Sequence, residues 1–324
     1  MFPYRRTYST YNVVTATRRE STPLRFSPLT VEDIPVIRPY LSAAPSRTCD
    51  FTIGGMFMWA DYFNYTYAIF NDTLFVKGVT EDDVTRAAFS LPLGKMGLDE
   101  SVDMLRGYCR ATGSGPLLFS AIPEVAVEPL RLLGVKTVSP LVEWSDYLYE
   151  AEDLATLSGK KMSKKRNHVN HFMAENPGYE LLPLTSGMIP DVRHFLQMVP
   201  LPIDKPVLAD IEREQVMRVL DNYGAYPFEG VVLKTPADGM VAFAIGEVIG
   251  DTLYVHIEKM NHEVSGAGEC INKLFAEYML DKTPHLRYIN REEAAGDPGL
   301  RKAKDSYHPA MLLEKFNVEM LTEF

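Results

Sequence analysis

Residues 254–275, YVHIEKMNHEVSGAGECINKLF, restrict the possible fold more than any other stretch of the chain. The stretch begins with alternating apolar and polar residues, which is typical of a β-strand, and ends in an amphipathic segment, which indicates a helix. Gly266 and Gly268 stand between the two. A helix start offers unpaired backbone amides that suit a phosphate, and glycine lets a ligand approach closely. The sequence alone leaves two interpretations open, a phosphate-binding loop and a plain flexible corner.

The residues around this stretch predict an α/β fold with a mixed sheet. Three strands are expected at 228–235, 240–250 and 252–260, with a tight turn at Gly250-Asp251 between the last two. A helix from Gly268, a strand at 286–290, a short helix at 299–307 and a final strand at 310–320 follow. Before them, residues 155–178 are expected to form one long helix that ends at Pro177-Gly178. A meander followed by alternating strands and helices is typical of an α/β sandwich.

The first half of the chain gives a weaker version of the same order, with a hairpin turn at Asn71-Asp72. We therefore expect a lead-in segment at 1–24, a first domain at 25–141 and a second domain at 142–324 that carries the site. The length of 324 residues agrees with two domains.

Composition excludes several classes of protein. A net charge of -10 argues against a generally basic nucleic-acid binder, and three widely spaced cysteines argue against a disulfide framework. No apolar run reaches the roughly 18 residues that a membrane-spanning helix needs. We expect a soluble, cytoplasmic protein.

Three stretches resemble a known family: DYLYEAEDLATLSGKKMSKKRNHVNHF (146–172), HIEKMNHEVSGAG (256–268) and INREEAAGDPGLRKAKDSYHP (289–309). Together they look like the phosphatidylglycerol lysyltransferase C-terminal-domain-like family, which is related to the Fem-type aminoacyl-tRNA-dependent transferases. The resemblance implies two tandem GNAT-like (acyl-CoA N-acyltransferase) domains. It also implies an acyl or aminoacyl transferase whose partner is tRNA and whose acceptor is a small molecule, a peptide or a lipid headgroup.

The donor site is expected where the glycine loop meets the basic run GKKMSKKR. On one helix, Lys161, Lys164 and Lys165 would share a face and could follow phosphates, although a charge run is more often a solvated face. Glu263 stands where GNAT loops generally carry Gln or Arg, and its carboxylate would repel a pyrophosphate. We expect the amides of the glycine-led helix to face this cationic helix across a shared cavity. The expected donor-binding set is Gly266, Ala267, Gly268, Lys161, Lys164, Lys165 and Arg166.

The chemistry is expected to come from Glu258 and Tyr307. Strand alternation puts Glu258 on one face with His256, where its carboxylate could hold or deprotonate an attacking amine. Tyr307 is similar in place to the tyrosine that protonates the leaving group in many GNAT enzymes. An ion pair for Glu258 and a buried hydroxyl for Tyr307 are the structural alternatives. The expected substrate-binding set is Asn167, Asn170, His256, Asn290, Arg291, Lys302 and Lys304.

No metal is expected. His168 and His171 are three residues apart, but no third ligand lies near them in sequence and the helix is basic. No cofactor is firmly implied beyond a donor substrate, aminoacyl-tRNA or acyl-CoA. Three functions remain open: an aminoacyl-tRNA-dependent transferase, an acetyl-CoA-dependent N-acetyltransferase and a non-catalytic ligand-binding protein.

Overall fold

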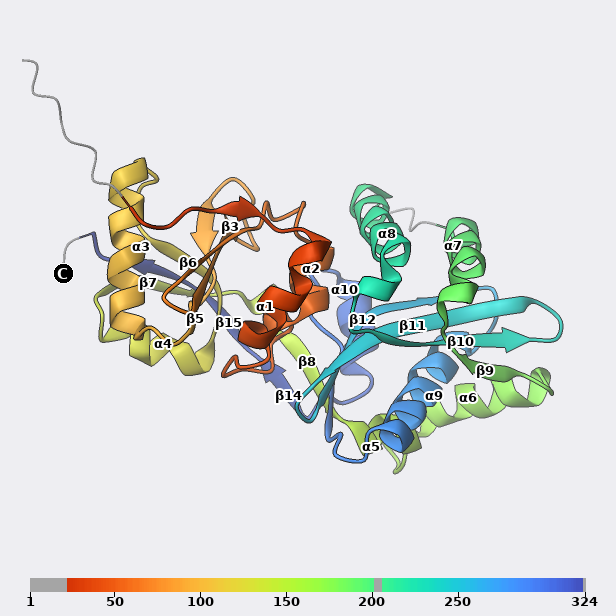
Figure 1. The fold of residues 1–324 in the computed structure, drawn as a ribbon. Coiled ribbons are helices and arrows are strands. Elements are labelled where there is room, and N and C mark those ends of the chain that lie inside the picture. Colours follow the sequence, from red (N-terminus) through yellow and green to blue (C-terminus); the bar gives the residue numbers. More distant parts are fainter. Residues whose placement is uncertain (1–21, 201–205, 323–324) are drawn as a thin grey trace, which may run out of the picture.

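The computed structural model describes residues 22–200 and 206–322, which form two lobes side by side (Figure 1). The predicted lead-in at 1–24 lies almost entirely outside the described residues. Each lobe is built on a mixed sheet with helices packed on it, so the expected α/β class with mixed sheets is confirmed.

The first lobe contains an eight-stranded sheet in the order β1-β2-β3-β4-β6-β15-β7, with β5 paired to β3. Its strands are β1 (Ser27–Pro28), β2 (Thr66–Phe70), β3 (Thr73–Val79), β4 (Ala87–Phe89), β5 (Leu93–Gly94), β6 (Leu118–Pro123), β7 (Val135–Pro140) and β15 (Lys315–Met320). Its helices are α1 (Ile34–Leu41), α2 (Ile53–Met58), α3 (Leu98–Thr112) and α4 (Glu124–Arg131). The predicted turn between β2 and β3 is confirmed, and both of its residues take positive φ.

The second lobe contains a seven-stranded sheet in the order β14-β8-β13-β12-β11-β10-β9. Its strands are β8 (Asp146–Glu150), β9 (Glu180–Pro183), β10 (Glu229–Thr235), β11 (Gly239–Ile249), β12 (Thr252–Met260), β13 (Tyr288–Asn290) and β14 (Met311–Leu313). Its helices are α5 (Ala151–Thr156), α6 (Ser163–Glu175), α7 (Ile189–Met198), α8 (Pro206–Asp221), α9 (Ala267–Lys282) and α10 (Pro298–Asp305).

Two apolar cores lie on opposite faces of the second sheet. On one face α9, α5 and α6 pack together over β10 to β12. On the other face α7 and α8 cover the sheet, and α2 of the first lobe joins them (Figure 1). This second core continues without a break into the first lobe, from Ile257 and Phe243 to residues such as Phe51 and Ile53. The two lobes therefore share buried apolar surface.

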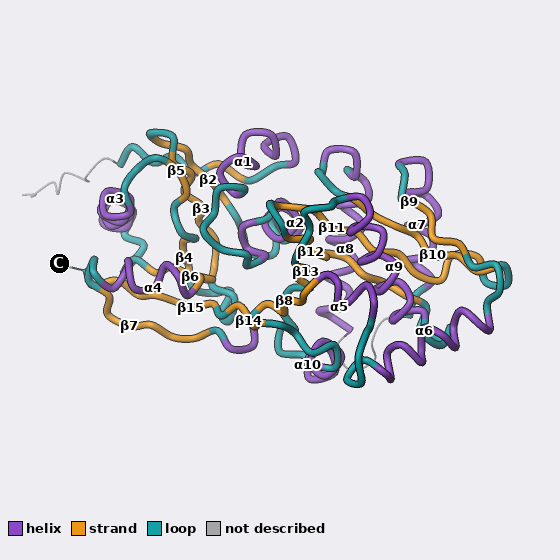
Figure 2. Tube along the Cα trace, turned by 90° about the horizontal axis from the view of Figure 1, so that it is seen from below, coloured by secondary structure: helices purple, strands orange, loops and turns teal. Residues whose placement is uncertain are grey.

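The end of the chain corrects the expected domain boundary. Residues 310–320 were expected as one strand of the second domain, but they form two strands in different sheets. β14 pairs with β8 in the second lobe, whereas β15 inserts between β6 and β7 of the first lobe (Figure 2). Glu314 alone separates the two strands, so the chain crosses between the lobes at this point. The hydrophobic pattern of the segment does not reveal which sheet each part joins.

The predicted long helix at 155–178 is also wrong in one respect. It is two helices, α5 and α6, separated by a turn in which Leu157 and Gly159 have φ of 48° and 77°. Arg166 donates hydrogen bonds to the carbonyls of both turn residues and so fixes this corner. As a consequence Lys161 precedes α6, and the predicted stripe of Lys161, Lys164 and Lys165 on one helix face does not form.

Candidate functional site

The two parallel strands of the second lobe separate where the site is expected. β12 and β13 pair only from Thr252–Tyr288 to Tyr254–Asn290. β12 then continues to Met260, while the chain after β13 turns away as Arg291, Glu292 and Glu293. From this segment Arg291 and Glu292 contact β12, through Glu258 and His256 respectively.

A β-bulge at His256 decides which way the side chains of β12 point. Ile245 pairs with Ile257 and Gly246 pairs with Val255, so His256 is the extra residue. A bulge breaks the period-2 alternation. His256 and Ile257 therefore both face α2 and α7, whereas Glu258 faces α9. The prediction that His256 and Glu258 share a face is wrong for this reason.

Glu258 is the centre of a partly buried polar network. Its Oε1 accepts a hydrogen bond from Arg291 Nη2 at 2.9 Å, and its Oε2 accepts one from Asn272 Nδ2 of α9 at 3.2 Å. The Arg291 guanidinium lies 5.0 Å from the ring centre of Tyr307, and the Lys165 ammonium lies 4.2 Å from the same centre. Four residues predicted independently for the site, Glu258, Arg291, Tyr307 and Lys165, are thus brought together.

Two atoms of this network have no partner although both are buried: Nη1 of Arg291, a donor, and Oδ1 of Asn272, an acceptor. Asn272 is only 4% exposed. An unsatisfied buried polar atom is costly, so this donor and this acceptor, whose side chains bind the same carboxylate, are candidates for contacts to a ligand. The Glu258 and Arg291 side chains are each 13% exposed, so the network reaches the surface.

Charge and protonation in the network suit a reaction that develops negative charge. Burial is the largest effect and opposes the charge on Arg291, but Glu258, Tyr307 and Tyr149 together outweigh it and raise the pKa of the guanidinium. Burial raises the pKa of the Tyr307 hydroxyl, against the opposing effect of Arg291. Tyr307 therefore keeps its proton near neutral pH and can donate it.

The glycine loop does not form the expected cavity. Gly266 is the N-cap of α9 with φ of 78°, and a Cβ on it would lie 2.6 Å from the carbonyl oxygen of His168. Helix α6 therefore packs directly on the loop. Glu269, in the first turn of α9, accepts from Lys165 Nζ at 3.2 Å and contacts His168 Nδ1 at 3.1 Å. The glycine at position 266 therefore serves the close packing of α6 on the loop. In addition, the first turn of α9, which was expected to receive phosphate, carries the Glu269 carboxylate.

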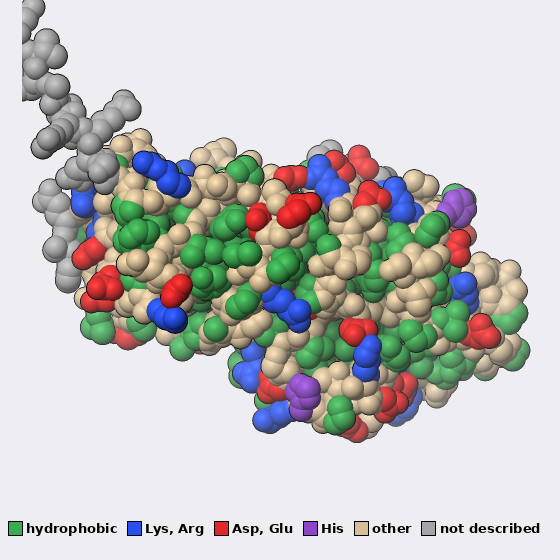
Figure 3. Space-filling view, viewed as in Figure 1, with side chains coloured by type: hydrophobic (Ala, Val, Ile, Leu, Met, Phe, Trp, Pro, Cys, Tyr) green, Lys and Arg blue, Asp and Glu red, His purple; other side chains and the backbone are tan. Residues whose placement is uncertain are grey.

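The remaining cations of the basic run divide into two groups. Lys161 and Lys164 are exposed, and the described residues provide no ion-pair partner for either. Arg166 and Lys165 are used inside the protein, as described above. Asn167 and Asn170 lie exposed on α6. Figure 3 shows Lys and Arg side chains interspersed with Asp and Glu over the face that it displays, without a continuous basic surface.

Three residues predicted to bind substrate are instead saturated by the protein. Asn290 donates to Arg47 O and Asp146 Oδ2, both at 2.8 Å, and accepts from Glu292 N. The Lys304 ammonium has three donors and uses them on the carbonyls of the segment 291–293. His256 lies between two carboxylates. These side chains shape the segment that carries Arg291 and are corrected from substrate-binding to supporting residues.

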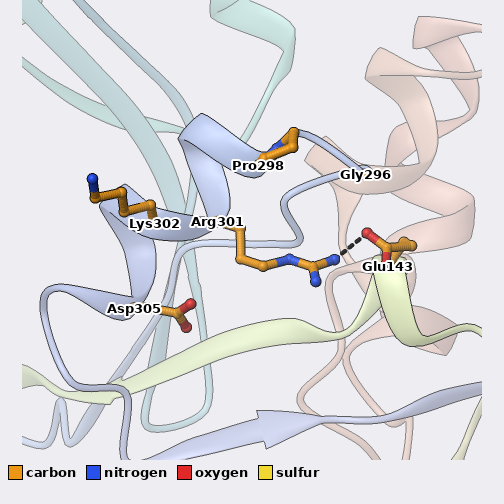
Figure 4. Close-up of a pocket in the computed structure, with 6 residues that line it drawn as sticks. All are labelled: Glu143, Gly296, Pro298, Arg301, Lys302 and Asp305. Carbon is orange, nitrogen blue, oxygen red and sulfur yellow. Dashed lines mark hydrogen bonds and ion pairs between the residues drawn. The ribbon is translucent and has the colours of Figure 1, made fainter.

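Lys302 lies apart from this network, in a surface hollow of about 580 Å³ beside α10 (Figure 4). The lining residues are Glu143, Gly296, Pro298, Arg301, Lys302 and Asp305. Arg301 forms an ion pair with Glu143 there. The hollow therefore does not include Glu258 or Arg291.

The junction of the lobes holds a cluster whose donor atoms have metal-ligand spacing. One ligand atom each of Cys49, Asp146 and Glu293 lie within 4.8 Å of one another. The Lys315 ammonium stands among them, 2.8 Å from Asp146 Oδ1 and 3.4 Å from Cys49 Sγ. A lysine thus takes the place where a cation would bind.

His256 makes the stability of the protein depend on pH. Its Nε2 lies 3.0 Å from Glu247 and its Nδ1 lies 2.6 Å from Glu292. Burial alone would lower the pKa of His256, but the two carboxylates raise it from 6.5 to about 9. A raised folded-state pKa stabilises the fold fully below the unfolded value and is lost as pH rises through the folded value.

We therefore expect the free energy of unfolding to fall by about 3 kcal/mol between pH 6.5 and pH 10. Urea denaturation across that range measures it. His256→Gln is the control, because it removes the titrating group, and its stability should change much less over the same range. An equal fall in the variant would assign the effect to other groups.

Sequence reasoning missed Asn272 and Glu269, both on α9. A sequence pattern that could have indicated Asn272 is ECINKLF, where this polar residue interrupts the apolar face of the helix. A polar residue at a core position of a helix that follows the glycine turn is a reason to look for a partner on the adjacent strand.

Comparisons with known proteins agree with this architecture. A family model described as "Phosphatidylglycerol lysyltransferase, C-terminal" matches residues 42–319. A conserved protein of unknown function from Bacteroides thetaiotaomicron is 27% identical, with a TM-score of 0.82 over 92% of this chain and 100% of that chain. No curated protein matches the sequence.

More distant structures share the fold. The structure of L-PGS from Bacillus licheniformis is 12% identical, with a TM-score of 0.61 over 88% of this chain and 91% of that chain. FemX is 9% identical, with a TM-score of 0.59 over 92% and 98%. Within the described residues, we find no helix with the length and apolar character needed to span a membrane.

Proposed function

The chain belongs to the phosphatidylglycerol lysyltransferase C-terminal family, and from that premise we propose that it transfers an aminoacyl group from aminoacyl-tRNA to an amine or hydroxyl acceptor. The observation that carries the proposal is the pair of unpartnered atoms beside Glu258, namely Arg291 Nη1 and Asn272 Oδ1. An aminoacyl ester offers groups that match both of them: a carbonyl oxygen to accept and an ammonium to donate.

In this proposal Arg291 binds the ester carbonyl. Attack on the carbonyl carbon moves negative charge onto its oxygen, and a buried donor in place before the reaction stabilises that charge. Nη2 donates to Glu258 and Nη1 has no partner, so the guanidinium can donate a hydrogen bond to the ligand without breaking its ion pair. This arrangement fixes the direction of Nη1.

Asn272 Oδ1 would accept from the ammonium of the aminoacyl ester, and Glu258 would act on the acceptor nucleophile. A carboxylate has about four acceptor positions, and two of those on Glu258 are used. The others can accept from the acceptor nucleophile and take its proton as the new bond forms. The bond from the carbonyl carbon to the ribose oxygen then breaks, and Tyr307 protonates the departing ribose hydroxyl.

The acceptor-side alternatives stay open, but one donor is disfavoured. Coenzyme A would need the amides of the glycine turn. That turn is packed against α6, and the Glu269 carboxylate lies in the first turn of the helix that follows it. A donor such as aminoacyl-tRNA, which is held over a larger surface, depends less on the glycine turn.

A thermal-shift screen separates the two donors: acetyl-CoA should give no saturable stabilisation. Ligand binding without turnover, unaffected by Glu258→Gln, would favour a non-catalytic protein.

The tRNA part of the proposal predicts a salt dependence. Lys161 and Lys164 are exposed cations that stand close to Lys165 in the sequence. Each phosphate contact adds roughly 0.7–0.9 to the slope of log affinity against log salt, so the Lys161→Ala/Lys164→Ala variant should reduce the slope by about 1.5. Filter binding of tRNA at several salt concentrations measures this.

The matched control is Lys95→Ala/Lys136→Ala, which removes two exposed lysines of the first lobe. It removes the same charge, and its slope should remain that of the parent protein. If both double variants lower the slope equally, the attraction is a property of net charge and the tRNA surface does not include the start of α6.

A further inference from the structure

The Arg291 side chain belongs to a backbone segment whose conformation is unfavourable without contacts from the rest of the protein. Glu292, the next residue, has φ of 58°. A left-handed conformation at a non-glycine residue persists only where its surroundings impose it. The direction of Arg291 therefore depends on whatever holds Glu292.

Contacts from several elements hold Glu292. Its amide donates to Asn290 Oδ1 at 2.6 Å, and its carbonyl accepts from Tyr147 N at 3.1 Å and from Lys304 Nζ at 3.2 Å. Its carboxylate contacts His256 Nδ1 at 2.6 Å. Of these partners, His256 alone binds the side chain, and it comes from the opposite face of β12 to Glu258.

His256 is itself fixed by the first lobe. Its Nε2 lies 3.0 Å from Glu247 Oε1, and the same oxygen accepts from the Gly54 amide of α2 at 2.8 Å. Gly54 lies against the imidazole so closely that a Cβ would be 2.2 Å from His256 Cδ2. The His256 side chain is 1% exposed. A glycine at this position is required for the contact.

We propose that His256 is a positioning residue through which the first lobe sets the guanidinium of Arg291, by a chain of contacts from Gly54 through Glu247, His256 and Glu292. The bulge at His256 is what makes this possible, because it turns His256 toward the first lobe while Glu258 still faces the reacting groups. The kinetic consequence rests on the proposed function; the structural consequence does not.

The kinetic test is a double-mutant cycle. His256→Gln should lower kcat about tenfold or more with little change in KM, because a displacement of about 1 Å can cost on the order of 100-fold. In an Arg291→Lys background the same change should cost nothing further, since its target is already lost. If the fall in kcat of the double variant equals the product of the two single-variant falls, the proposal is overturned and His256 has a purely structural role.

Arg47→Gln is the matched control. It removes another contact between the lobes, the hydrogen bonds from Arg47 to Asp251 at 3.1 Å, and it does not touch Glu292. It should lower stability without changing kcat. A fall in kcat equal to that of His256→Gln would mean that any weakening of the junction suffices, which contradicts a specific path.

A second readout needs no activity. Crystal structures of the parent protein and His256→Gln should differ in the Arg291 Nη2 to Glu258 Oε1 contact of 2.9 Å, which the variant loses and Arg47→Gln keeps. If the parent shows no transfer with any donor, the proposed function fails while this comparison still decides the inference. An unmoved Arg291 in His256→Gln overturns it.

Discussion

Replacing Arg291 with lysine is expected to reduce aminoacyl transfer by about 100- to 1,000-fold, which is the usual cost of removing a donor to a developing oxyanion. Lysine keeps the positive charge beside Glu258, so the buried carboxylate remains paired. It loses the planar fork that lets one nitrogen bind Glu258 while the other points to the ligand. The measurement is the initial rate with labelled aminoacyl-tRNA at saturating donor.

The control for this change is Arg218→Lys on α8. Arg218 forms exposed ion pairs with Glu214 at 3.0 Å and with Asp61 of the first lobe, so the same substitution there tests the effect of an Arg-to-Lys change at a paired arginine away from Glu258. Its transfer rate should equal that of the parent. A rate for Arg291→Lys within threefold of the parent would remove Arg291 from the reaction.

Replacing Lys315 with methionine is expected to lower the free energy of unfolding by about 3–5 kcal/mol, the cost of removing one partner of a buried ion pair. The Lys315 side chain is 1% exposed and contacts Asp146 Oδ1 at 2.8 Å, Asp50 Oδ2 at 3.0 Å and Glu293 Oε2 at 3.5 Å. Methionine fills similar volume but leaves several buried carboxylates without a cation. Urea denaturation at pH 7.5 measures the loss.

The loss should shrink as pH falls. Burial raises the pKa of Asp146 to about 6 even with Lys315 beside it, so without the lysine the carboxylates take up protons more readily. Lys136→Met is the control, since Lys136 is 58% exposed in its pair with Glu319 and should change stability by less than about 1 kcal/mol. A Lys315→Met loss no larger than that of the control would show that the cluster does not hold the lobes together.

The parts of the fold that could be predicted from the sequence are those encoded locally. The alternation of 228–260 predicts β10 to β12, and the turns at Asn71-Asp72 and Gly250-Asp251 are signalled by their residue types. The break between α5 and α6 was missed because GKKMSKK contains no proline, and a single glycine is tolerated within helices.

Features that depend on distant parts of the chain could not be predicted. The bulge at His256 arises because Ile245 and Gly246 of β11 pair with Ile257 and Val255, which leaves His256 unpaired, and nothing in YVHIEKM distinguishes the segment from a regular strand. The place of β15 in the first sheet depends on β6 and β7, which lie far away in the sequence and pair with it on either side. For the site, charge and position pointed to Glu258, Arg291 and Tyr307, whereas the closed glycine turn is visible only once α6 is placed against it.

The most direct measurement is the crystal structure of the protein with a non-hydrolysable aminoacyl-adenosine, in which an amide replaces the ester. The account predicts that its carbonyl oxygen accepts from Arg291 Nη1 and that its amino group contacts Glu258 or Asn272 Oδ1. Binding of the analogue elsewhere, with both of those atoms still lacking a partner, would contradict it.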